Sequence, residues 1–234
     1  KDVDIRKSVE RVKDADIVIF ASGISPSLEG EEMGVNLPGF KKGDRTDIEL
    51  PAVQRELIDA LHRAGKKIIL VNCSGSPIGL EPETQKCEAI LQAWYPGQQG
   101  GKAVAEVLFG DYNPAGKLPV TFYRNVSQLP DFEDYNMTGR TYRYMQDVPL
   151  FPFGYGLSYT TFGYGKTVLD KNELTAGQSL KLTVPVTNTG KRNGEEVVQV
   201  YLRKQGDAEG PIKTLRALKR VSIPAGKTVN VEFD

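Results

Sequence analysis

The stretch KIILVNC at Lys67–Cys73 is a continuous run of mostly apolar residues with no helical spacing. Such a run is typical of a strand that is buried on both faces of a parallel sheet. DIVIFAS at Asp16–Ser22 and AILQAW at Ala89–Trp94 show the same pattern. We therefore predict three buried parallel strands, and a short fourth strand at Leu118–Phe122.

Segments with helical spacing separate these strands. Lys1–Ala15 and Gln98–Phe109 both place apolar residues at helical intervals. Pro51 suits the first turn of a further helix and Gly65 suits its C-terminal cap. Its apolar face consists of Val53, Leu57, Ala60, Leu61 and Ala64. Alternating strands and helices predict an α/β domain with right-handed crossovers.

The pattern changes near residue 160. Leu180–Val186 and Glu196–Leu202 alternate apolar and polar residues, and Val221–Ile223 and Val229–Phe233 continue the alternation. Short alternating strands with turns between them predict an antiparallel β-sandwich. The predicted fold is α/β followed by all-β, with domains at residues 1–123 and 161–234 and an aromatic linker at residues 124–160.

Both predicted domains look incomplete. The first begins with a helix that no strand precedes, so its sheet lacks an N-terminal strand. The second shows about four clear strands, whereas a sandwich of this kind usually has roughly seven. We therefore expect the chain to be one part of a larger protein.

Composition excludes two classes of partner. The chain has 30 basic and 30 acidic residues, so no net positive field attracts nucleic acid. Its longest apolar runs, such as Ile17–Ala21, are far too short to span a bilayer. We expect neither a nucleic-acid partner nor a membrane partner.

Cysteine and histidine are scarce. Cys73 and Cys87 fit two free buried thiols, and one disulfide stays open as the alternative. His62 is the only histidine, lies in the middle of a predicted helix, and no GxSxG elbow accompanies it. These features disfavour an independent α/β hydrolase with a Ser-His-Asp triad. They also provide no metal cluster, so we expect no metal and no cofactor.

The acidic sequence LEGEE at Leu28–Glu32 lies in a long aperiodic loop, Gly23–Leu50, after the first predicted strand. This loop is at the C-terminal edge of the parallel sheet, where open α/β sheets bind ligands. Crowding of three carboxylates raises the pKa of at least one, which favours a proton donor. Taken alone, an acidic loop tip is also typical of solvated surface.

Two longer segments are more specific. GDYNPAGKLPVTFY at Gly110–Tyr123 and PLFPFGYGLSYTTF at Pro149–Phe162 resemble hallmark sequences of glycoside hydrolase family 3, the exo-acting β-glucosidases and β-xylosidases. The resemblance extends from the first strand to Asp234. It implies the C-terminal portion of such an enzyme, with an (α/β) sandwich domain and a fibronectin type III-like domain. The family's nucleophile, an Asp, belongs to a barrel domain that this chain does not contain.

The resemblance also implies a general acid/base. In the family this residue is a Glu in the corresponding loop, and the xylosidase-like branch has a Leu-Glu-small-Glu pattern there. Here the pattern reads LEGE at Leu28–Glu31, which assigns the role to Glu31. The insertion EMGVNLPGFKKG that follows keeps Glu29 and Glu32 open as alternatives.

Other residues near this edge are candidates for substrate binding or for structure. Asp44 and Arg45 correspond to a family Asp-Arg pair, which either fixes the loop by an ion pair or contacts sugar. Trp94 follows the third strand and either contacts sugar or belongs to the core. Glu29 is the second candidate for substrate binding. TGRTYRYM at Thr138–Met145 either packs or lines a sugar site.

The implied reaction is retaining hydrolysis of a terminal β-linked xylosyl or glucosyl residue from an oligosaccharide. We favour β-xylosidase because of the LEGE pattern, with β-glucosidase as the alternative within the family. A non-catalytic module that binds carbohydrate or a partner is the alternative outside it. The missing barrel would be the main partner, and this chain alone would be inactive. The resemblance is compatible with a homo-oligomer and with a periplasmic or extracellular location.

Overall fold

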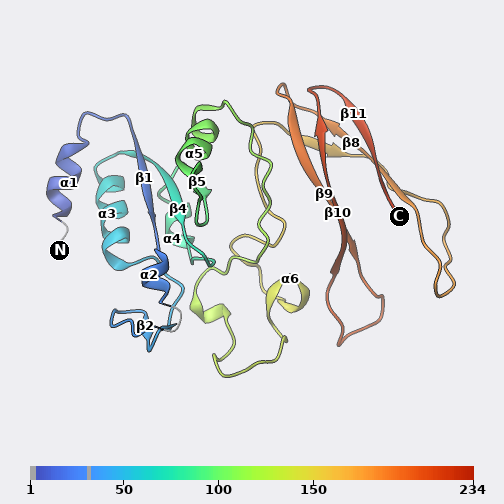
Figure 1. Ribbon diagram of the computed structural model, residues 1–234, viewed down its shortest axis with the longest axis horizontal. Coiled ribbons are helices and arrows are strands. Elements are labelled where there is room, and N and C mark those ends of the chain that lie inside the picture. Colours follow the sequence, from blue (N-terminus) through green and yellow to red (C-terminus); the bar gives the residue numbers. More distant parts are fainter. Residues whose placement is uncertain (1–3, 31–32) are drawn as a thin grey trace. The chain divides into compact units, whose positions relative to one another are not determined.

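A computed structural model describes residues 4–30 and 33–234 (Figure 1). The chain divides into two compact units. The first consists of residues 1–104, 120–140 and 146–152, and the second of residues 105–119, 141–145 and 153–234. A parallel sheet lies in the first unit and antiparallel sheets lie in the second, so the predicted combination of α/β and all-β folds is confirmed. The domain boundaries at residues 123 and 160 stay a prediction.

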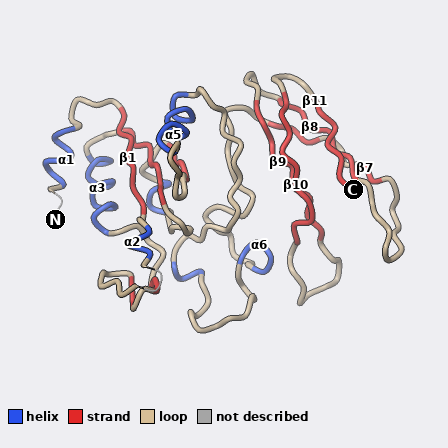
Figure 2. Tube along the Cα trace, in the orientation of Figure 1, coloured by secondary structure: helices blue, strands red, loops and turns tan. Residues whose placement is uncertain are grey.

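Three parallel strands form the sheet of the first unit (Figure 2). They are β1 (Ile17–Gly23), β4 (Lys67–Cys73) and β5 (Ala89–Gln92), in that order across the sheet. Ile17 pairs with Lys67, and Ile69 pairs with Ala89. All three predicted strands therefore exist and are parallel. Their C-terminal ends meet at one edge, as parallel strands must.

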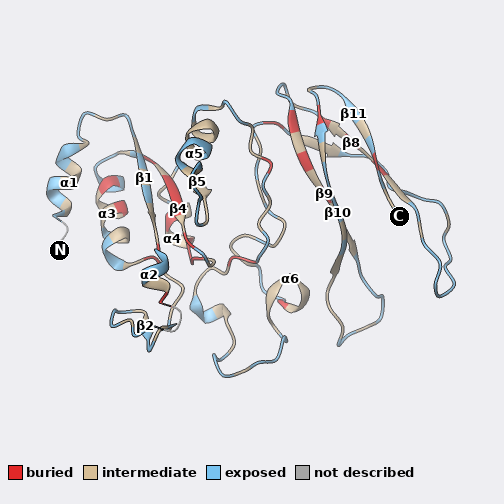
Figure 3. Cartoon of the chain, viewed as in Figure 1, coloured by how far each residue is buried: buried red, intermediate tan, exposed pale blue. Residues whose placement is uncertain are grey.

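Helices α1 (Ile5–Arg11) and α3 (Ala52–Arg63) pack against the sheet, and α5 (Gly100–Phe109) follows β5. The buried core is concentrated on β4, α3 and the loops beside them (Figure 3). Ile58 and Leu61 are the buried residues of α3, whereas Val53 and Ala64, both predicted to face the core, are exposed. Only the middle turns of α3 face the sheet, because Val53 lies in the first turn and Ala64 follows the last.

The long loop Gly23–Leu50 contains short elements that its sequence pattern did not predict. They are α2 (Pro26–Glu29) and a hairpin of β2 (Phe40–Lys41) and β3 (Asp44–Arg45). A further four-residue helix, α4 (Glu81–Thr84), follows β4. Elements of two to four residues are too short to show a hydrophobic period.

The predicted strand Leu118–Phe122 is wrong. Between α5 and the sandwich the chain is mostly loop, apart from η1 (Val126–Gln128) and α6 (Thr141–Tyr144) (Figure 2). Phe122 forms only an isolated antiparallel bridge with Phe151. Pro119 offers no backbone N–H for a strand ladder, which explains why the apolar run does not become a sheet strand.

The second unit contains a sandwich of two antiparallel sheets. One has the order β11-β8-β6, with β7 also paired to β8, and the other is β9 with β10. Their strands are β6 (Phe162–Tyr164), β7 (Val168–Leu169), β8 (Leu182–Asn188), β9 (Gly194–Leu202), β10 (Thr214–Ile223) and β11 (Thr228–Phe233). The buried residues Val184, Val186, Val198, Ile223 and Val231 form its core. The two very short strands, β6 and β7, are those that the alternation missed.

Residues of the two hallmark segments, 110–123 and 149–162, contact each other within the second unit. Oδ1 of Asn113 accepts hydrogen bonds from the Ser158 hydroxyl and from the Tyr159 amide, each at 2.8 Å. A Cβ atom on Gly156 would lie 2.1 Å from the carbonyl oxygen of Gly116, so only glycine allows this approach. These residues therefore have a structural role in this unit.

Several predictions made for single residues are also resolved. Cys73 and Cys87 are free thiols, both half-buried, and burial raises the pKa of Cys87 to about 11. His62 is exposed on α3. Among the residues described here, no helix combines the length and the apolar character needed to cross a membrane.

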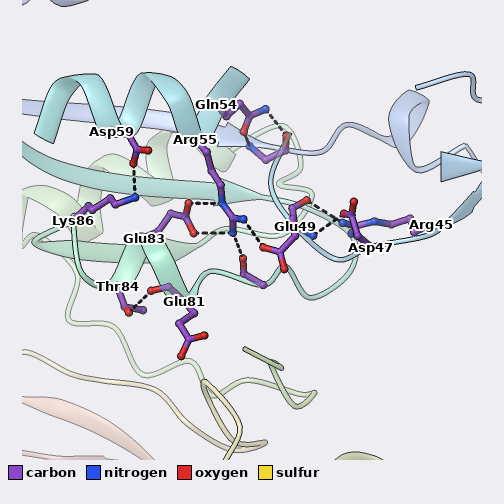
Figure 4. A network of polar contacts seen from close by, with 12 residues as sticks. Arg45, Asp47, Glu49, Gln54, Arg55, Asp59, Glu81, Glu83, Thr84 and Lys86 are labelled. Carbon is purple, nitrogen blue, oxygen red and sulfur yellow. Dashed lines mark hydrogen bonds and ion pairs between the residues drawn. The ribbon is translucent and has the colours of Figure 1, made fainter. Parts of the chain in front are cut away.

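A buried ion pair joins α3 to α4 in the first unit (Figure 4). Nε of Arg55 donates to Oε1 of Glu83 at 2.9 Å, and Glu83 is only 1% exposed. The same guanidinium lies 2.5 Å from the Glu49 carboxylate and donates to the Gly79 carbonyl at 2.6 Å. Burial alone would lower the pKa of Arg55. The carboxylates of Glu83 and Glu49 raise it by a larger amount, so the net change in this pKa is upward.

We expect Arg55→Met to lower the free energy of unfolding of the first unit by about 3 kcal/mol, because the buried Glu83 charge loses its partner. Urea unfolding can be followed by the fluorescence of Trp94, the only tryptophan, which lies in this unit. Lys13→Met is the matched control. It breaks an exposed pair with Glu10 and should cost less than about 1 kcal/mol. Equal losses in the two variants would contradict a special role for the buried pair.

Candidate active site

The candidate site lies at the C-terminal edge of the parallel sheet. After β1 the chain forms α2, which ends at Glu29. The loop after β4 carries Ser76, and the loop after β5 carries Trp94 and Tyr95. Three loops that are distant in sequence therefore meet here, as the parallel topology requires.

The carboxylate of Glu29 is held from two sides. The Ser76 hydroxyl donates to Oε1 at 2.6 Å, and the Tyr95 hydroxyl donates to Oε2 at 2.5 Å. A Cβ atom on Gly75 would lie 2.5 Å from the Tyr95 ring and 2.6 Å from Oε2 of Glu29, so any larger residue here would displace the two side chains from this contact. Both oxygens are engaged by the protein, which fixes the orientation of this half-buried carboxylate.

Tyr95 is influenced by the same contact. Burial, followed by the hydrogen bond to the Glu29 carboxylate, raises the pKa of Tyr95 to about 12. The phenol therefore stays protonated and keeps donating to Glu29 throughout the physiological range.

Arg45 extends this cluster. Its Nη1 lies 3.5 Å from the Ser76 hydroxyl oxygen, and its Nη2 donates to the Glu49 carbonyl at 3.2 Å. Burial lowers the pKa of Arg45, and the carboxylates of Asp47, Glu29 and Glu49 oppose that effect. The ion pair expected between Asp44 and Arg45 is not formed. Asp44 is exposed, because neighbouring residues of a strand point to opposite faces, so Arg45 fixes the loop through hydrogen bonds instead.

Trp94 has an unusual backbone conformation. Its φ of 56° lies in the left-handed region, which is strained for a bulky residue. The half-buried indole packs edge-on against Phe122, with ring centroids 6.0 Å apart. The next residue, Tyr95, is the one that reaches Glu29. Strained residues of this kind cluster at functional sites.

A buried polar network lies beneath the cluster, at the ends of β4 and β5. The side-chain nitrogen of Asn72, Nδ2, donates to Oε1 of Gln92 at 2.6 Å and to the Ser74 hydroxyl at 3.2 Å. The Ser74 hydroxyl donates to the Ser76 carbonyl at 2.8 Å. These contacts order the loop that presents Ser76 to Glu29.

The structure covers only part of the predicted acidic cluster. Glu29 is described, whereas Glu31 and Glu32 lie outside the described residues. Sequence reasoning did not assign Ser76 or Tyr95 to the site. Their position directly after two buried strands, at the same sheet edge, was the signal that could have identified them.

Comparison with known proteins identifies the family. The Glycosyl hydrolase family 3 C-terminal domain matches residues 2–159. The Fibronectin type III-like domain matches residues 196–234. Because the first match covers more than half of the chain, the chain belongs to glycoside hydrolase family 3.

Individual relatives are several times longer than this chain. The chain is 60% identical over 231 residues to a xylan 1,4-beta-xylosidase of Xylanibacter ruminicola, a match that covers 99% of the chain and 26% of that protein. It is 38% identical to a periplasmic beta-glucosidase of Salmonella typhimurium, covering 98% of the chain and 30% of that protein. The solved structure of a b-glucosidase from Erythrobacter marinus matches with 40% identity and a TM-score of 0.83, covering 98% of the chain and 30% of that chain. The chain thus spans about a quarter to a third of the length of these relatives.

We expect Tyr95→Phe to lower the free energy of unfolding of the first unit by about 1 kcal/mol at pH 7. This is less than the roughly 1.5–3 kcal/mol usual for a hydrogen bond to a charge, because Tyr95 is 40% exposed. The raised pKa sets the pH dependence. The contribution should be constant below about pH 10 and should disappear as the pH rises through about 12. Urea unfolding of both proteins from pH 7 to just above pH 12 measures this contribution. Tyr135→Phe, at a residue that is 90% exposed, is the control, and an equal loss there would contradict the assignment.

Proposed function

We propose that the chain is the C-terminal part of an exo-acting retaining β-glycosidase, a β-xylosidase, and that it supplies the general acid/base. The observation that carries this proposal is the acidic loop at the C-terminal sheet edge, held there by the contacts of Glu29, in a chain of glycoside hydrolase family 3. The domain division at residues 123 and 160 belongs to the same proposal.

Glu31 is the proposed acid/base. The two oxygens of Glu29 already accept hydrogen bonds from Ser76 and Tyr95, which favours an anchoring role for Glu29. A proton donor must instead direct a free oxygen toward the glycosidic bond. Glu31 follows this anchor by two residues and keeps the position that the LEGE pattern implies. Glu32 remains the alternative.

The proposed mechanism is a double displacement. An Asp of the barrel domain attacks the anomeric carbon while Glu31 gives its proton to the departing glycosidic oxygen. Glu31, now a carboxylate, then removes a proton from a water molecule that attacks the covalent intermediate and releases the sugar and the Asp. Arg45 and Ser76 keep the Glu29 anchor in place throughout.

The sugar specificity rests on similarity. The xylan 1,4-beta-xylosidase of Xylanibacter ruminicola, at 60% identity, favours a terminal xylosyl residue. The 40% identity to the Erythrobacter marinus b-glucosidase supports glucoside hydrolysis as the second candidate. The similarity to a periplasmic beta-glucosidase supports a periplasmic or extracellular location.

The 234-residue chain alone should hydrolyse neither aryl β-xylosides nor aryl β-glucosides. One carboxylate cannot complete a double displacement without the nucleophile. Release of nitrophenol from nitrophenyl β-xyloside and nitrophenyl β-glucoside measures this hydrolysis. If the chain alone showed robust turnover that a covalent glycosidase inhibitor abolished, this result would contradict the proposal that the nucleophile lies in another domain.

In the complete enzyme, Glu31→Gln should lower kcat on xylosides with poor leaving groups by about 10²- to 10⁴-fold, the usual contribution of general acid catalysis. Activated aryl xylosides need little protonation, so their first step should persist. Azide attacks without losing a proton and should restore turnover of these activated substrates.

Glu29→Gln and Glu32→Gln are the matched controls for this experiment. Loss of the Glu29 anchor should lower activity without azide rescue, and Glu32→Gln should resemble wild type. If Glu31→Gln behaves like wild type on unactivated xylosides, the role passes to whichever variant shows azide rescue.

A further inference from the structure

A buried polar row crosses the C-terminal ends of the three parallel strands. Ser22, Asn72 and Gln92 are register partners on β1, β4 and β5, so their side chains share one face of the sheet. Two strand positions earlier on β4, the same face carries Ile68 and Leu70, which belong to the hydrophobic core. Asn72 is fully buried. An amide in such a position is costly unless hydrogen bonds compensate for the lost contact with water.

The hydrogen bonds of Asn72 compensate only in part. Its side-chain nitrogen donates to Gln92 and Ser74, but its Oδ1 accepts no hydrogen bond from residues 4–30 and 33–234. The Ser22 hydroxyl oxygen, which is buried in the same row, likewise has no partner among those residues. A leucine in place of Asn72 would match the neighbouring core and remove an unpaired oxygen. Stability alone therefore does not explain an asparagine at this position.

The amide of Asn72 instead supports a chain of contacts that reaches the candidate site. Ser74 is also fully buried, and its hydroxyl accepts hydrogen bonds from Asn72 and from Nε2 of Gln92, each at 3.2 Å. The same hydroxyl donates to the Ser76 carbonyl at 2.8 Å. The Ser76 hydroxyl then donates to Oε1 of Glu29 at 2.6 Å. The loop after β4 is thus held by side chains of two strands at the point where it reaches Glu29.

We propose that Asn72 is a positioning residue for the glycosidase reaction. It acts through Ser74 and Ser76 on the Glu29 carboxylate, which anchors the loop of the proposed acid/base. This inference rests on the proposed glycosidase function and adds to it a residue from the interior of the sheet. Proton transfer needs the donor within hydrogen-bond reach of the departing oxygen, so a shift of the anchor weakens general acid catalysis.

The test uses the complete enzyme with Asn72→Leu, which keeps the approximate size of the side chain and removes its N–H donors. For xylosides with poor leaving groups, kcat/KM should fall about 5- to 20-fold, a part of the roughly 10²- to 10⁴-fold that general acid catalysis contributes. An activated aryl xyloside needs little protonation and should keep its kcat/KM within about 2-fold. A loss of folded enzyme would lower both values equally, so the ratio between the two substrates isolates the positioning role.

Two further variants keep the test sharp. Ser22→Ala is the matched control, because its hydroxyl lies in the same buried row without a hydrogen-bond partner in the described part of the chain, and it should change neither value. Ser74→Ala removes the link between Asn72 and Ser76 and should reproduce the selective loss. When Asn72→Leu and Ser74→Ala are combined, the two losses should not multiply, because both break the same chain of contacts.

Equal losses on both xylosides, no loss on either, or losses that multiply in the double variant would overturn this role of Asn72. A crystal structure of Asn72→Leu supplies a readout that needs no turnover. The Ser76 hydroxyl should lie beyond hydrogen-bond distance of the Glu29 carboxylate in the variant, and an unchanged contact would overturn the inference.

The wild-type enzyme separates this inference from the function on which it rests. If wild type hydrolyses neither xylosides nor glucosides, the glycosidase proposal itself fails, whatever the crystal structure of the variant shows. If wild type hydrolyses glucosides alone, the β-xylosidase is rejected and the same series on glucosides decides the role of Asn72.

Discussion

The contact between Arg55 and the buried Glu83 carboxylate orders the part of the fold on which the candidate site depends. The same guanidinium also binds Glu49 and the Gly79 carbonyl, so one side chain of α3 fixes α4 and two loops. The Glu49 carbonyl in turn accepts a hydrogen bond from Arg45. The buried Glu83 carboxylate is thereby linked, through Arg55 and Glu49, to the position of the Arg45 guanidinium at the site. Replacing such a pair with apolar residues often costs little stability, whereas removing one partner alone leaves a buried charge and is costly.

At the sheet edge, the main constraint is the pair of hydrogen bonds that holds the Glu29 carboxylate. Glu29 makes two short hydrogen bonds to groups on two different loops, so its position is determined by β4 and β5 as well as by its own helix. An acid held in this way can anchor the chain that follows it. A neighbouring acid can then exchange protons without carrying a structural duty.

Sequence reasoning recovered the regular parts of the fold. Buried strands such as Lys67–Cys73 were found because a long apolar run permits few other structures. Leu118–Phe122 was misassigned because local hydrophobicity outweighed the missing N–H of Pro119. At the site, the acidic cluster made Glu29 a candidate for substrate binding or proton donation, and these roles stay predictions. The strand order places the loops of Ser76 and Tyr95 at the same edge, but the sequence does not show that their hydroxyl groups reach Glu29 across 47 and 66 positions.

The left-handed backbone at Trp94 limits how this protein can change. Glycine at that position would relax the backbone, but it would also empty the space beside Phe122 that the indole fills. Relief of the strained backbone would gain about 1–3 kcal/mol. Removal of a buried tryptophan side chain costs about 3–5 kcal/mol, so the loss in packing would offset or exceed that gain. Directed evolution toward thermostability should therefore find few improvements at this residue. Residues remote from the sheet edge offer a better starting point for an engineer.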